Sequence, residues 1–149
     1  ITTEGGLNVL KNKKKISNII NKLQNHNIKV SVFVDPCIKQ IAVCKELRTF
    51  SIELHTGEFC DNKKNKKEEF RQIKKSAEFA KKNNLECHAG HGLKYEDVKQ
   101  IAKINEISEL NIGHFIIGEA VFVGLKNSIL KMRKIIDNVR KKNIYLKSA

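Results

Sequence analysis

The chain has 149 residues, of which 40% are hydrophobic and 30% are charged. This composition is typical of one folded globular domain and excludes an intrinsically disordered chain. No apolar run approaches the length of a bilayer-spanning helix, so we expect no membrane segment. The net charge is +13, but the lysines fall mostly opposite apolar stripes, without interleaved aromatic residues. We therefore expect no nucleic-acid partner.

The cysteines form no C-x-x-C pair, and a core of this size needs no disulfides. We expect free thiols in a reducing compartment, and thus a cytoplasmic protein. The polar, glycine-rich start predicts no signal peptide. Because the chain also lacks an initiator Met, we expect it to be a piece of a longer protein. The cysteines are Cys37, Cys44, Cys60 and Cys87.

Hydrophobic periodicity predicts alternating helices and strands. An initial loop over 2–7 precedes a helix around 16–23. Four strands are then expected, each followed by a helix, and a longer amphipathic helix over 125–139 ends the series. The expected strands cover 30–34, 50–54, 85–88 and 110–112. Their helices fall around 38–42, over 70–80, after 95–97 and over 115–123.

Repeated strand–helix units imply a parallel sheet and an α/β fold. Four strands could form a small open sheet or half of an eight-stranded barrel. The extra short helix over 115–123 favours the TIM (β/α)8 barrel, because in such barrels a helix of this kind commonly forms a phosphate site.

Histidine and glycine recur after three of the apolar runs, in His55-Thr56-Gly57, in His88-Ala89-Gly90-His91-Gly92 and in Gly113-His114. Polar groups at the carboxyl ends of successive parallel strands are how such folds build active sites. Glycine lets the backbone approach a ligand closely, and histidine exchanges protons near neutral pH. The three motifs therefore predict a site at this edge of the sheet.

Glu53 is a candidate for acid–base work or charge stabilisation. Because side chains alternate along a strand, Glu53 and His55 share one face while Ile52 and Leu54 share the other. In a barrel the apolar pair packs under the helices, which places Glu53 inside. A carboxylate there is costly unless it is paired or belongs to a site. The alternative is a structural ion pair with a neighbouring strand.

His91 lies between two glycines, which keep its ring accessible for proton transfer. The alternative is a loop histidine bonded to the backbone. His55 and His88 are expected to be structural. A metal site is a further alternative, but no H-x-x-x-H or C-x-x-C chelate is present, and glycine-rich turns suit phosphate better than zinc. We therefore expect no metal.

Four motifs stand in order along the chain, and similarity extends between them. They are Thr2-Thr3-Glu4-Gly5-Gly6-Leu7, Ile52-Glu53-Leu54-His55-Thr56-Gly57, Ala89-Gly90-His91-Gly92-Leu93 and Glu109-Leu110-Asn111-Ile112-Gly113-His114 with Ile116-Ile117-Gly118. Together they resemble the pyridoxine 5′-phosphate synthases of deoxyxylulose-dependent vitamin B6 biosynthesis. The resemblance covers the whole chain.

The resemblance implies a TIM barrel that assembles as a homo-octamer and uses neither a metal nor an organic cofactor. It implies condensation of 3-amino-2-oxopropyl phosphate (aminoacetone phosphate) with 1-deoxy-D-xylulose 5-phosphate to pyridoxine 5′-phosphate, inorganic phosphate and water. A typical barrel has about 250 residues. Residues 1–149 would then be the C-terminal portion of a single barrel domain, without its N-terminal strands, and would be inactive alone.

By match of motif, the resemblance implies that Thr2 contacts deoxyxylulose phosphate, Glu53 stabilises the transition state and His91 donates a proton. Gly92, Gly113 and His114 would bind aminoacetone phosphate. The chain departs from the family at His88, where asparagine is usual, and at Glu119, where a basic residue is common. The competing interpretation is a non-catalytic α/β module that binds a phosphorylated ligand.

Overall fold

The computed structural model describes residues 5–62 and 64–147, with side chains up to residue 141. Four strands form one sheet, parallel throughout, with the order β1-β2-β3-β4. They are β1 (Ser31–Val34), β2 (Ser51–His55), β3 (Glu86–Gly90) and β4 (Ile107–Asn111). The expected parallel α/β fold is confirmed.

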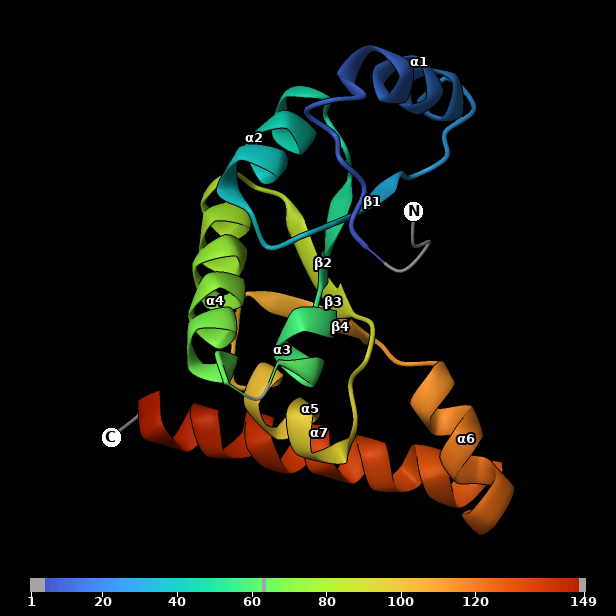
Figure 1. The fold of residues 1–149 in the computed structure, drawn as a ribbon, viewed down its shortest axis with the longest axis vertical. Helices are drawn as coiled ribbons and strands as arrows, with labels where there is room; N and C mark the ends of the chain where they lie inside the picture. The colour runs from blue at the N-terminus through green and yellow to red at the C-terminus, as the bar shows by residue number, and fades with distance from the viewer. Residues whose placement is uncertain (1–4, 63, 148–149) are drawn as a thin grey trace.

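Helices connect the strands and follow the last one. They are α1 (Lys13–Gln24), α2 (Ile38–Glu46), α3 (Gly57–Asp61), α4 (Lys66–Lys82), α5 (Tyr95–Ile101), α6 (His114–Val123) and α7 (Leu125–Lys147). Figure 1 shows α2 and α4 side by side along one flank of the sheet, while α7 runs across the molecule below α5 and next to α6. The elements expected around the strands are therefore all present.

Two local features differ from the sequence expectation. The short helix α3 follows β2 directly, and its five residues are too few to show a helical period. Strand β4 begins at Ile107 and ends at Asn111 instead of covering 110–112. Its pairing with β3 shifts register between Cys87 and His88. A bulge inserts one extra residue and breaks the alternation by which a strand is recognised.

One face of the sheet packs under the helices. Ile52 and Leu54 of β2 are completely buried, and α4 covers this strand with Ile73 and Ala77, which are also buried. Burial of a large aliphatic side chain contributes roughly 1.5–3 kcal/mol. The apolar half of β2 therefore anchors the sheet to its helices, as the alternation predicted.

The other face of the sheet is polar. Across the four strands Phe33, Glu53, His88 and Glu109 occupy successive paired positions. These four side chains are half-buried or exposed. Parallel sheets are usually covered on both faces. A row of half-buried and exposed side chains is therefore unusual for a parallel sheet, and it marks this face as the candidate location of a site.

The end of the chain carries an exposed apolar surface. No side chain of α6 is fully buried, and Phe122 is 87% exposed. The start of α7 adds Leu125, Ile129 and Leu130 to this surface. Large exposed apolar patches commonly mark contacts with other protein. Among the described residues, no helix has the length and apolar character needed to cross a bilayer.

Candidate functional site

The carboxyl ends of the strands enclose a cleft of about 490 Å³. It brings together the sequence-predicted residues Glu53, His91, Gly92, Gly113 and His114. Thr2, the remaining predicted site residue, lies outside the described residues. The rest of the described lining consists of Phe33, Leu93, Lys94, Asn111, Ile112 and Phe115. Residues more than 50 positions apart thus meet at one edge of the sheet, as expected for parallel strands.

Glu53 is half-buried on the polar face, where its Oε2 accepts a hydrogen bond from Asn111 Nδ2 at 2.8 Å. Gly90, on the strand between them, makes this contact possible. A Cβ at Gly90 would lie 2.2 Å from Glu53 Oε1 and 3.1 Å from the Asn111 Cβ. Within the described residues Glu53 forms no ion pair, so the alternative of a structural ion pair is not supported there. Its carboxylate faces the cleft.

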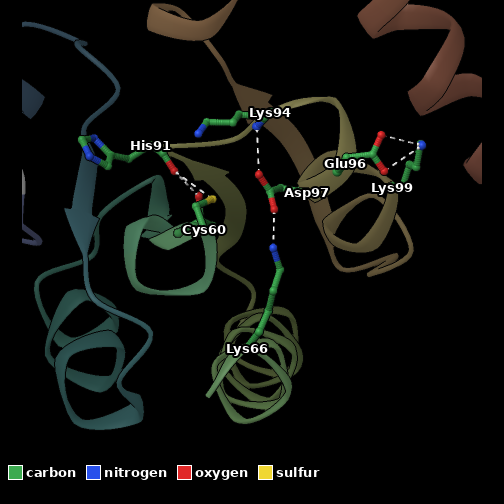
Figure 2. A network of polar contacts seen from close by, with 8 residues as sticks. Cys60, Lys66, His91, Lys94, Glu96, Asp97 and Lys99 are labelled. Carbon is green, nitrogen blue, oxygen red and sulfur yellow. Dashed lines mark hydrogen bonds and ion pairs between the residues drawn. The ribbon is translucent and has the colours of Figure 1, made fainter. Parts of the chain in front are cut away.

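His91 has a backbone φ of 78°, a left-handed conformation that is uncommon outside glycine. Its carbonyl oxygen accepts from Thr56 Oγ1 at 2.5 Å and lies 3.8 Å from Cys60 Sγ. Figure 2 shows the ring pointing away from Cys60. The backbone is therefore held by the turn after β2 and by α3, while the imidazole projects toward the cleft. Backbone strain of this kind often accompanies functional sites.

The next residue, Gly92, also has a positive φ of 76°, and a Cβ there would meet the Cys60 Cβ at 3.2 Å. Two consecutive left-handed residues turn the chain sharply after β3. This turn exposes the His91 side chain at the cleft. It requires glycine at the second position because α3 packs directly beneath.

Gly113 is the N-cap of α6, and its carbonyl accepts the first helical hydrogen bond from the Ile117 N–H at 3.0 Å. The N–H groups that begin a helix have no partner within the helix and favour an anion. Nothing lies within 4 Å of the position a Cβ would take at Gly113. The start of α6 therefore offers open space and backbone donors at the wall of the cleft, which suits a phosphate group.

Comparison with known proteins identifies the family. Residues 1–138 match the family model described as "Pyridoxal phosphate biosynthesis protein PdxJ". The chain belongs to the PdxJ family. A pyridoxine 5′-phosphate synthase of Pelagibacter ubique is 47% identical over 138 residues, which cover 91% of this chain and 58% of that relative.

Other relatives with the same name give similar values. The protein of Ehrlichia ruminantium (strain Welgevonden) is 48% identical over 93% of this chain and 57% of its own length. The protein of Prochlorococcus marinus (strain NATL2A) is 46% identical over 98% of this chain and 60% of its own length. This PdxJ-family chain therefore spans about three fifths of the relatives that it matches.

His88 and Glu119, the two expected departures from the family pattern, both lie close to titratable side chains. His88 lies between Glu86 at 3.2 Å and Glu109 at 3.7 Å on the polar face. The hydrogen bond from His88 lowers the pKa of the Glu86 carboxyl. Glu119 lies 3.8 Å from Lys131 Nζ on α7. His88 pairs with carboxylates other than Glu53, and Glu119 faces a cation outside the cleft lining.

Two residues of this PdxJ-family cleft were not identified from the sequence as site residues. Asn111 holds Glu53, and Lys94 carries the only fixed positive charge among the described lining residues. Asp97 positions Lys94 by accepting a hydrogen bond from its backbone N–H at 3.2 Å, and Lys66 Nζ binds the same carboxylate at 2.5 Å (Figure 2). The alternation of β4 could have indicated Asn111, since it follows Glu109 by two residues.

Cys44, Cys60 and Cys87 offer neither a nucleophile nor a metal ligand at neutral pH. Burial raises the pKa of the Cys44 thiol to about 11 and that of Cys87 to about 12. Cys60, beside the His91 carbonyl, also has a pKa raised to about 12, mainly by burial. Only thiolates bind metals or attack substrates well. Among the described residues no group of three or more potential ligands could hold a metal ion.

Proposed function

We propose that the protein containing this chain is a pyridoxine 5′-phosphate synthase. It would condense aminoacetone phosphate with 1-deoxy-D-xylulose 5-phosphate to pyridoxine 5′-phosphate, inorganic phosphate and water. The observation that carries this proposal is the convergence of a carboxylate, an imidazole and a helix start in one cleft, from Glu53, His91 and Gly113. Membership of the PdxJ family supports the same reaction.

The reaction begins when an amine and a ketone form an imine, and water leaves only if its oxygen receives a proton. His91 acts as the proton donor, because its ring projects toward the cleft from a fixed backbone. Glu53 stabilises positive charge that develops on the condensing nitrogen. The Asn111 amide orients this carboxylate for the task.

The phosphate of aminoacetone phosphate binds at Gly92, Gly113 and His114. The unpaired N–H groups at the start of α6 provide donors, and Lys94 adds a positive charge to the same cleft. Thr2 contacts deoxyxylulose phosphate. In this proposal the amine-bearing substrate lies along the edge of β4, between the helix start and Glu53.

Residues 1–149 form the C-terminal portion of a single TIM-barrel domain in this proposal. The polar row of the sheet then faces the barrel interior, and further strands complete the site. The chain alone would be inactive for that reason. The exposed apolar surface of α6 and α7 supports burial against other protein, as in a homo-octamer. We place the protein in the cytoplasm, where both phosphorylated substrates would be made.

The test is product formation by the complete gene product that contains this chain, supplied with both phosphorylated substrates. We expect pyridoxine 5′-phosphate from the wild type and a loss of at least about 100-fold for His91→Ala. His26→Ala, in the exposed turn after α1, is the matched control and should retain full activity. A folded wild type that binds phosphate but makes no product would favour the phosphate-binding module instead.

A further inference from the structure

Two imidazoles meet at the edge of the cleft. The ring centroids of His55 and His91 lie 4.9 Å apart with an interplanar angle of 55°. Phe33 of β1 packs edge-on against His55 with a centroid distance of 5.2 Å. The His55 side chain is only 11% exposed. The ring of His91 therefore packs against the ring of His55, which is itself largely buried.

Asp35 fixes the ring of His55. Its Oδ1 lies 3.2 Å from His55 Nδ1 and also accepts the Gly6 N–H at 3.0 Å. His55 Nε2 is buried and has no partner among the described residues. The ring therefore has a polar contact with Asp35 on its Nδ1 side and none among the described residues on its Nε2 side.

Gly57 provides the slot in which the two rings meet. A Cβ at this position would lie 2.6 Å from His55 Nε2 and 3.2 Å from His91 Cδ2. Thr56, between His55 and Gly57, binds the His91 carbonyl through its hydroxyl and the Gly90 carbonyl through its backbone N–H at 2.9 Å. Each residue of the His55-Thr56-Gly57 turn thus acts on His91 or on the residue before it.

We infer that His55 and Asp35 are positioning residues that orient the imidazole of His91 for proton transfer. Asp35 orients His55, and the largely buried His55 ring supports the ring of His91. This inference rests on the proposed role of His91 in the synthase. Asp35 is 57% exposed, and exposed ion pairs contribute little to stability. The pair is therefore better suited to orientation than to holding the fold together.

The experiment compares His55→Phe with His55→Asn in the complete gene product. Phenylalanine keeps a ring beside His91 but cannot bind Asp35, whereas asparagine can donate to Asp35 but has no ring. We expect kcat to fall by about 10-fold or more in both, because small errors in placing a catalytic group are costly, while KM stays within about twofold. His26→Phe is the control and should match the wild type.

Gly57→Ala tests the slot without replacing either histidine. The added methyl group should push the rings apart and lower kcat to a similar extent. Wild-type kcat in all three variants, or a change in KM alone, would overturn the inference. A loss of kcat that only follows the folded fraction, measured by circular dichroism, would overturn it as well.

A second measurement separates this inference from the proposed function. The NMR resonance of the His91 Cε1–H, assigned with His91→Ala, reports the ring environment without substrate. We expect it to shift in His55→Phe, in Asp35→Asn and in Gly57→Ala, but not in His26→Phe. If the wild-type protein makes no product but the His91 resonance shifts in these variants, the proposed reaction is wrong, while the contact between His55 and His91 is confirmed. An unmoved resonance overturns the positioning role whatever the activity.

Discussion

The two faces of the sheet use the same strands in different ways. On the helix-covered face Ile52 and Leu54 are fully buried, so that packing decides their position. On the polar face Glu53 accepts a hydrogen bond from Asn111, and His55 Nδ1 lies 3.2 Å from Asp35 Oδ1. One face therefore specifies the fold, and the other is free to carry chemistry at small cost in stability.

The largest expected contrast is between substitutions at two neighbouring residues of β2, Leu54 on the covered face and Glu53 on the polar face. Leu54→Ala should lower the free energy of unfolding by about 3 kcal/mol, because it leaves a cavity in a packed core. Glu53→Gln should change that free energy by less than about 0.5 kcal/mol but lower kcat by about 100-fold. Urea unfolding and steady-state kinetics of the complete gene product measure the two effects. A Glu53→Gln protein that is unstable but active would contradict the division.

Gly90→Ala should show an intermediate effect on both quantities. Its methyl group would lie on the Glu53 carboxylate and near the Asn111 carbonyl oxygen, at 2.2 Å and 2.9 Å. Glu53 must then rotate away, which removes its hydrogen bond and costs about 1–3 kcal/mol through overpacking. We expect kcat to fall by about 10-fold. Ala89→Gly, on the covered face of the same strand, is the control and should lower stability without a comparable loss of kcat.

The smallest expected effect comes from His88 and depends on pH. His88 lowers the pKa of Glu86 below its ordinary value of 4.5. A carboxyl whose pKa is depressed by folding adds stability above its unfolded pKa and loses it as pH falls through its folded pKa. His88→Asn should thus be less stable than the wild type at about pH 5.5, and the difference should narrow toward about pH 3. A difference that widens on acidification would show that His88 does not act through Glu86.

The sequence by itself determined the alternation of strands and helices, the parallel sheet and the two faces of β2. It also indicated Glu53, His91, Gly113 and His114, because strand alternation and the carboxyl ends of parallel strands follow from local periodicity. These features depend on residues that are near one another in the chain. A single sequence is sufficient to detect them.

Only the tertiary structure decided how the site is held together. The bulge in β4 sets the register that brings Asn111 across Gly90 to Glu53, 58 positions away. The contact of His55 with His91 depends on the turn after β3 and on the room left by Gly57. Such contacts join residues that are distant in sequence. The lack of a side chain at Gly57 or Gly90 is important only because another residue occupies the space that a side chain would take. No local pattern encodes either condition, so the positioning role of His55 became visible only in the folded chain.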